Sequence, residues 1–145
     1  MSARAIFVTA LAGIALACSS PDSPNGPSDV PGTYVLVSVG GSALPYTVPN
    51  TVGNTVVVNS ASATLGDSGS YAIAGTGTIS GVVNNVLTDN GVWVQSGDKV
   101  NFTSGHISGA FYFAKAKEDT LTLTLPGGFL NSTTGTFSLL FVKGP

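Results

Sequence analysis

The chain has 145 residues, of which 8% are charged, and its formal net charge is −2 at pH 7. This length corresponds to a single domain. Nucleic acid is not expected as a partner, because phosphate binding needs clustered lysine or arginine and the whole chain has only five such residues. Serine, threonine, asparagine and glycine must therefore provide most of the polar surface.

An uncharged apolar stretch follows Arg4 at the N-terminus. It runs from Ala5 to Ala17 and ends in small residues, which is the pattern of a secretory signal peptide. The stretch is too short to cross a bilayer as a helix, for which about 20 residues are needed. We therefore expect residues 1–17 to be a signal peptide that is removed on export.

Residues Ala15-Leu16-Ala17-Cys18 resemble the lipobox of bacterial lipoproteins, although Ala15 and Ala17 also fit the Ala-x-Ala site of ordinary signal peptidase. Cys18 is the only cysteine, so no disulfide can form within the chain, and this favours the lipoprotein interpretation. The resemblance implies lipidation of Cys18 by a diacylglyceryl group and an N-acyl chain. By the same resemblance, Ser19 points to the outer membrane of the cell envelope.

Residues 18–31 are predicted to be a tether. They carry Pro21, Pro24, Pro27 and Pro31 among serine, asparagine, glycine and aspartate, a composition that cannot build a packed core. As a polyproline II helix this segment would reach about 40 Å.

Residues 32–145 are predicted to form one β domain, because short β-branched and aromatic runs alternate with turn residues and no helical apolar period persists. The first strand runs from Gly32 to Val39 and stops at Gly40-Gly41. A second strand covers Thr55–Asn59. Residues Ala61–Leu65 are expected to extend the second strand past a bend.

A turn is predicted at Gly66–Gly69, followed by a long strand from Ser70 to Ser80. Asp89-Asn90-Gly91 predicts a tight hairpin turn, because Asn-Gly readily adopts the left-handed conformation that such turns require. Val92–Gln95 then forms the next strand.

The remaining runs complete a set of about eight strands. They are predicted at Val100–Thr103, Ser108–Ala114, Thr120–Leu125 and Thr136–Val142. In Thr120–Leu125 strict alternation places the three leucines on one face. Turns recur about every 8–12 residues, so the fold class is all-β with antiparallel strands, an up-and-down barrel or alternatively a β-sandwich.

The start of the domain resembles that of lipocalin-like barrels. Gly32-Thr33-Tyr34 matches their Gly-x-Trp opening with tyrosine in the tryptophan position, and Lys143 stands where such barrels place a cation against that ring. The stretches Gly32–Val39 and Gly41–Pro45 also resemble small secreted lipoproteins of environmental bacteria. Both resemblances imply a lipocalin-like fold and neither implies an activity.

One string in the chain has a catalytic appearance. Gly66-Asp67-Ser68-Gly69-Ser70 resembles the nucleophile segments of chymotrypsin-like proteases and of GDSL esterases. The only histidine, His106, follows the serine, which is not the order in those proteases, and the Asp-x-x-His of the esterases is absent. We therefore expect a hairpin turn here and no enzyme.

No metal or other cofactor is expected. His106 is the only nitrogen ligand of its kind and is predicted to lie in a loop or at a strand edge. The carboxylates are predicted to be solvated charges, mostly in turns, and not a catalytic pair or a calcium loop. These carboxylates are Asp67, Asp89, Asp98, Glu118 and Asp119.

Strand aromatics are the candidate ligand-binding residues, with packing in the core as the alternative. The proposed set is Trp93, Tyr71, Phe102, Phe111 and Phe113. Alternation also turns Gly75 and Gly77 inward, where small residues would leave space for a small apolar ligand near Trp93. The opposing interpretation is that these glycines mark bends that close the space.

Two functions follow from these predictions. The first is an exported, membrane-tethered binding protein that holds a small apolar ligand in the barrel. The alternative is a non-catalytic structural or protein-interaction module of the envelope whose barrel is filled. The volume of the barrel interior distinguishes them.

Overall fold

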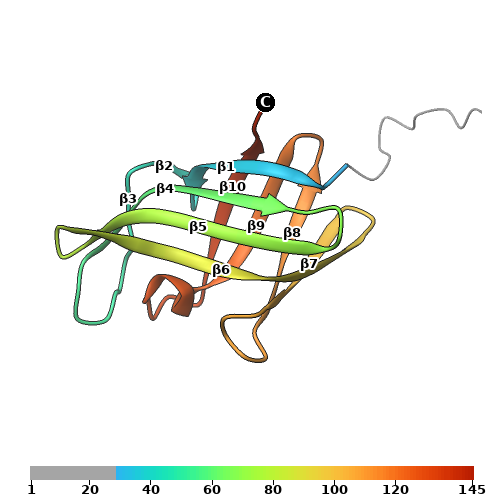
Figure 1. The fold of residues 1–145 in the computed structure, drawn as a ribbon. Coiled ribbons are helices and arrows are strands. Elements are labelled where there is room, and N and C mark those ends of the chain that lie inside the picture. Colours follow the sequence, from blue (N-terminus) through green and yellow to red (C-terminus); the bar gives the residue numbers. More distant parts are fainter. Residues whose placement is uncertain (1–28) are drawn as a thin grey trace, which may run out of the picture.

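The structure is a computed structural model that describes residues 29–145. The predicted signal peptide, Cys18 and the tether up to residue 28 lie outside the described residues. The described part contains ten strands and one short 3-10 helix (Figure 1). In chain order these are β1 (Gly32–Val39), β2 (Ser42–Ala43), β3 (Tyr46–Thr47), β4 (Val56–Leu65), β5 (Ser70–Ile79), β6 (Val82–Ser96), β7 (Lys99–Ser104), β8 (Phe111–Lys117), β9 (Thr120–Pro126), η1 (Gly127–Leu130) and β10 (Thr136–Lys143).

Eight of these strands form a closed antiparallel barrel, which confirms the predicted fold class and excludes the sandwich. Their order is β1-β10-β9-β8-β7-β6-β5-β4, and β4 pairs with β1 to close the sheet. From β4 to β10 each strand pairs with the next strand along the chain, and β1 pairs with both β10 and β4. Closure leaves no free edge in the barrel wall.

The hairpin between β5 and β6 differs from the sequence prediction. Its turn is Ser80-Gly81, where both residues have the positive φ angles of a type I′ turn (49° and 83°). The predicted turn at Asp89-Asn90-Gly91 is wrong, because these residues lie inside β6 and pair with β5. Gly91 instead allows β6 and β7 to approach closely. A Cβ at this position would meet the carbonyl oxygen of Thr103 on β7.

The remaining predicted strands lie close to where they were expected. A bulge follows Val58, so the bend between the two predicted halves of β4 is a register shift within one strand. The strand predicted from Ser108 begins later, at Phe111, because residues 105–110 form the loop before β8. Gly66–Gly69 is the exposed turn that the sequence predicted.

Alternation fills the barrel with apolar side chains. Leu121, Leu123 and Leu125 of β9 share the inner face and are each at most 1% exposed. Inner-face residues of the other strands complete the core. The largest of these are Tyr34, Leu36, Leu65, Tyr71, Ile73, Leu87, Phe102, Tyr112, Phe137, Leu139 and Phe141.

The inward glycines do not leave space. A Cβ on Gly75 would lie 3.0 Å from Cβ of Leu87 and 3.1 Å from Cβ of Ala61, both inward residues of the neighbouring strands. A Cβ on Gly77 would meet the carbonyl oxygen of Val57. These glycines permit close approach of neighbouring chain, which is the alternative that the sequence left open.

Two sets of contacts hold segments that flank the barrel strands. Nζ of Lys143 lies 5.9 Å from the centre of the Tyr34 ring, as the lipocalin-like resemblance implied, and donates to the carbonyl oxygen of Asp29. At another part of the barrel, η1 buries Leu130. Oγ of Ser132, which follows η1, donates to the carbonyl oxygen of Pro49 in the chain after β3.

In residues 29–145 no helix is long and apolar enough to cross a membrane.

Candidate functional site

A buried carboxylate organises one region of the barrel interior. Asp89 on β6 is 1% exposed and accepts three side-chain hydrogen bonds. Its Oδ2 accepts from the hydroxyls of Tyr71 (2.6 Å) and Tyr112 (2.7 Å), and its Oδ1 accepts from Oγ of Ser104 (2.7 Å). We call these four residues the Asp89 network. They come from β5, β6, β7 and β8, so the network joins four consecutive strands.

The hydrogen bonds compensate for burial of the charge. Burial by itself raises the pKa of the Asp89 carboxyl, but the bonds from Tyr71, Ser104 and Tyr112 together lower this pKa below its ordinary value. Burial raises the pKa of both tyrosines, and the carboxylate that they contact raises it further. At neutral pH the network therefore holds an anion and two protonated phenols.

Aromatic rings enclose the network. The Phe102 ring stacks on Tyr112 at 5.1 Å and meets the edge of Tyr71 at 4.9 Å. Tyr112 also makes an edge contact of 5.3 Å with Phe129 of η1. This shell keeps water away from the carboxylate, which strengthens its hydrogen bonds.

Ser104 extends the network into the loop between β7 and β8. While its hydroxyl donates to Asp89, its Oγ accepts from the backbone N–H of Ile107 (2.9 Å) and of His106 (3.2 Å). The backbone N–H of Gly105 donates to the carbonyl oxygen of Asn90, next to Asp89. The start of this loop is thus fixed to the barrel by the Asp89 network.

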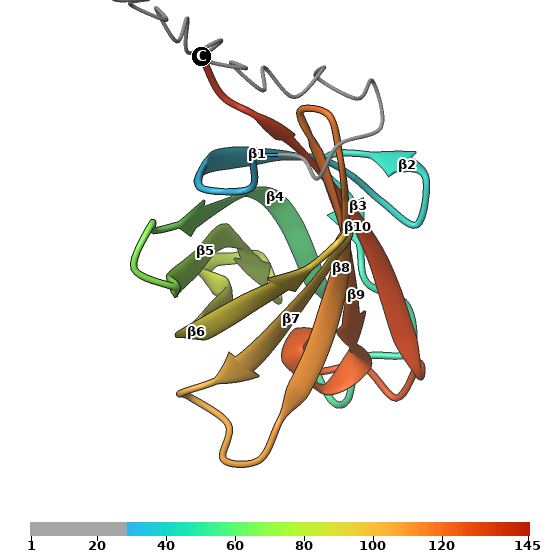
Figure 2. The ribbon, with the colours of Figure 1, turned by 90° about the vertical axis from the view of Figure 1, so that its right-hand side faces the viewer.

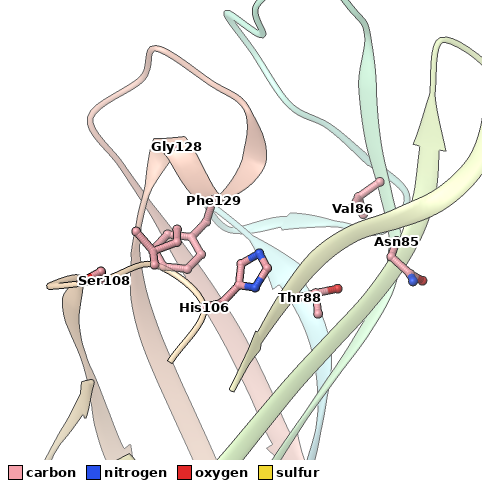
Figure 3. A pocket seen from close by; sticks show the side chains of 8 residues that line it. Asn85, Val86, Thr88, His106, Ser108, Gly128 and Phe129 are labelled. Carbon is pink, nitrogen blue, oxygen red and sulfur yellow. The ribbon is translucent and has the colours of Figure 1, made fainter. Parts of the chain in front are cut away.

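A pocket of about 530 Å³ opens beside this loop (Figure 3). Three segments line it: β6, the β7–β8 loop and η1. The lining residues are Asn85, Val86, Thr88, His106, Ile107, Ser108, Gly128 and Phe129. Figure 3 shows His106 between Thr88 of β6 and Phe129 of η1.

The pocket wall combines hydrogen-bonding groups with apolar surface. Asn85, Thr88, His106 and Ser108 supply donors and acceptors, whereas the ring of Phe129 is half-buried and apolar. No aspartate, glutamate, lysine or arginine is among the lining residues. Such a wall suits an uncharged ligand that forms hydrogen bonds and has one apolar face.

All three walls of the pocket are connected to the Asp89 network. Thr88 precedes Asp89 on β6, Ser104 binds the loop that carries His106, and Tyr112 contacts Phe129. The buried carboxylate therefore holds the three walls in one arrangement.

Three of the five aromatic residues predicted to bind a ligand, Phe102, Phe111 and Phe113, line a small pocket of about 160 Å³ on β7 and β8, whereas Tyr71 and Trp93 are not part of its lining. Tyr71 and Phe102 are buried in the packed interior. Phe111 and Phe113 lie on the outer face of β8, where they are 71% and 47% exposed. Trp93 lies at the barrel rim, and its indole N–H is directed at the turn between β4 and β5.

Three residues of the network were missed by the sequence analysis. Asp89 was predicted to be a solvated charge, which is wrong, whereas the other four carboxylates are exposed in turns as expected. Ser104 and Tyr112 were not among the candidates. The available signal was alternation, since Asp89 is in phase with the inward Leu87 and Tyr112 is in phase with the inward Ala114.

The residues of the catalytic-looking string do not form a charge-relay arrangement. Oγ of Ser68 lies 3.2 Å from Oγ of Ser70 in an exposed turn, while His106 belongs to the β7–β8 loop. Within residues 29–145, histidine, cysteine and carboxylate side chains do not gather in a group of three that could hold a metal ion.

Fold and site together define this chain as a closed eight-stranded up-and-down β-barrel with a packed interior and a pocket outside its core. Searches for a matching protein family, a matching curated protein and a matching solved structure found none. The interpretation of the pocket below therefore depends on its own geometry.

Proposed function

We propose that this chain is an exported, lipocalin-like binding protein of the bacterial envelope, tethered to the outer membrane through acylated Cys18. Its ligand would be a small uncharged molecule that occupies the pocket between β6, the β7–β8 loop and η1. One observation carries the choice of site. The barrel interior is packed, while the open pocket has walls fixed by the Asp89 network.

The proposed ligand differs from the apolar molecule that the sequence suggested. Side chains fill the inner face of the barrel, so a ligand there would have to displace core residues. In the pocket, by contrast, polar groups of His106, Thr88 and Ser108 accompany the Phe129 ring. A sugar or another polyhydroxy compound has both the hydrogen-bonding groups and the apolar ring face that this wall requires.

Ligand binding is tested by NMR of the only histidine. The imidazole signals of His106 are unique in the spectrum, so titration with a panel of neutral monosaccharides, disaccharides and nucleosides reports directly on the pocket. A saturable shift that is lost in Phe129→Ala and kept in Phe111→Ala supports the proposal. If no compound moves the His106 signals, or if both variants behave alike, the proposed site is wrong.

The membrane tether is tested separately by the intact mass of protein extracted from membranes. We expect a mature chain that starts at Cys18 and carries acyl groups, and we expect Cys18→Ser to move the protein into the soluble fraction. A mature chain with an unmodified Cys18 would refute the anchor while leaving the pocket proposal intact.

A structural or protein-interaction module is the second candidate function, because the packed interior is what that alternative requires. We propose a non-catalytic role in either case. The side-chain contact of Ser68 is with the hydroxyl of Ser70 (3.2 Å), which is not a general base, and this supports the proposal. A failed ligand titration together with normal anchoring would favour the interaction module.

A further inference from the structure

The outer face of β6, β7 and β8 carries an apolar patch. Val92 and Val94 of β6 are 56% and 65% exposed, and Phe111 and Phe113 of β8 are 71% and 47% exposed. We call these four residues the outer patch. Figure 2 shows the three strands side by side on the part of the barrel that faces the viewer.

Strand register brings the four side chains together. Thr103 of β7 pairs with both Val92 and Phe111, and Asn101 pairs with both Val94 and Phe113. The patch thus consists of two rows, each with an uncharged polar residue between two apolar ones. Along each strand the two apolar residues are two positions apart and therefore share the outer face, and exposed apolar surface of this kind marks a binding surface.

Lysines continue the same outer face. Lys115 and Lys117 follow Phe113 on β8 at alternating positions, and Lys99 pairs with Lys115 across β7 and β8. Nζ of Lys99 lies 5.3 Å from the centre of the Phe113 ring. Only Lys143 among the described lysines lies elsewhere.

We propose that the outer patch docks on the surface of a lipid bilayer. Phenylalanine and valine would enter the boundary between headgroups and acyl chains. Lys99 and Lys117 would extend towards the phosphates, as would Lys115 by exchanging its exposed ion pair with Asp98 (3.2 Å) for a phosphate. The backbone of this face is paired within the closed barrel, so shallow insertion would leave no strand edge without partners.

The N-terminal part of the chain favours a bilayer over other occupants. This argument rests on the proposed anchor at Cys18, which would keep the domain within about 40 Å of the membrane. Near the start of β1, the backbone N–H of Lys143 donates to the carbonyl oxygen of Asp119, in the turn that follows Lys117. The tether therefore joins the barrel at the end where the lysines lie.

The opposite side of the barrel supplies a matched control. In the closed order of strands, β1 and β7 are separated by three strands in either direction. Val35 and Val37 on the outer face of β1 are 49% and 42% exposed, comparable with Phe113. They have similar apolar exposure but lie away from the outer patch.

The test uses the exported chain with Cys18→Ser, which has no lipid and no cysteine. An environment-sensitive fluorophore is attached to a new cysteine, Val92→Cys in one protein and Val35→Cys in the other. Vesicles of phosphatidylethanolamine and phosphatidylglycerol are then added. We expect a blue shift at position 92 only. Because the acyl group is absent, the result is independent of whether Cys18 is modified in the native protein.

Substitutions of the patch complete the test. Phe111→Ser with Phe113→Ser should weaken vesicle partitioning by at least about tenfold, and Val35→Ser with Val37→Ser by less than about twofold. The proposal is overturned if position 92 gives no vesicle-dependent signal or if both positions respond equally. It is also overturned if the fluorophore at position 92 already shows blue-shifted emission without vesicles, because this would indicate that a second copy of the chain covers the patch.

Discussion

Replacement of Asp89 by asparagine should destabilise the barrel substantially. Asp89 is the only charged side chain in the buried part of the described chain, and three hydroxyls donate to it. Asparagine keeps one acceptor oxygen and places an NH₂ group where the carboxylate accepted. At least one hydroxyl of Tyr71, Tyr112 or Ser104 then loses its acceptor.

The size of the effect follows from the number of bonds. A hydrogen bond to a charged group contributes about 1.5–3 kcal/mol and a neutral one about 1 kcal/mol. In Asp89→Asn one hydrogen bond to a charged group is lost and the others become neutral hydrogen bonds. Part of this loss of stability is offset because asparagine carries no charge to desolvate. We expect Asp89→Asn to lower the free energy of unfolding by about 2–4 kcal/mol.

Urea unfolding followed by fluorescence of Trp93, the only tryptophan, measures this change. The matched control is Asp98→Asn, since Asp98 forms an exposed ion pair with Lys115 and should contribute less than about 1 kcal/mol. The two variants should therefore differ clearly in their urea midpoints. Equal midpoints would refute the assignment of Asp89 as the organising residue of the interior.

The wild type and Asp89→Asn also give a pH test. Because the pKa of Asp89 is lower in the folded than in the unfolded chain, its stabilising effect is complete above the ordinary carboxyl pKa and is lost as pH falls through the lowered value. The stability difference between the wild type and Asp89→Asn should thus shrink below about pH 4. A difference that stays constant down to strong acid would contradict the charged state of Asp89.

Three further predictions concern single positions or pH. Gly91→Ala should lower the free energy of unfolding in urea by about 1–3 kcal/mol, because its Cβ would meet neighbouring backbone. As a control, Gly128→Ala has open space around it and should lower this free energy by less than about 1 kcal/mol. Ser68→Ala should leave stability within about 1 kcal/mol and the His106 spectrum unchanged, and a larger loss would contradict its place in a simple turn. Above about pH 10 tyrosines ionise in the unfolded chain, whereas Tyr71 and Tyr112 stay protonated in the folded chain, so the free energy of unfolding should fall as pH rises. This fall should be less steep in Tyr71→Phe. Equal slopes of stability against pH in the wild type and the variant would contradict the raised pKa.

Most strands could be predicted from the sequence because their signals are local. Alternation in Thr120–Leu125 defines both a strand and its inner face, and Gly66–Gly69 contains turn formers between two strands. The pairing of Lys143 with the Tyr34 ring was also expected, on the basis of a family resemblance. These features need no knowledge of distant parts of the chain.

The Asp89-Asn90-Gly91 segment shows where local signals fail. Asn-Gly favours a hairpin turn only if its backbone is free to take positive φ, and here β5 and β7 pair with it on both sides. The polar side chain of Asp89 is acceptable inside because hydroxyls of Tyr71, Ser104 and Tyr112 reach it from three other strands. None of these partners can be identified from the residues adjacent to Asp89.

The sequence by itself determined the all-β class, the positions of most turns and the inward face of most strands, since these depend on neighbouring residues and the two-residue period of a strand. Tertiary structure alone decided whether the barrel is hollow. Gly75 and Gly77 face inward as the period requires, but the space beside them is occupied by Leu87, Ala61 and the backbone of Val57. How closely strands approach one another depends on twist and register of the closed sheet, which no local pattern encodes.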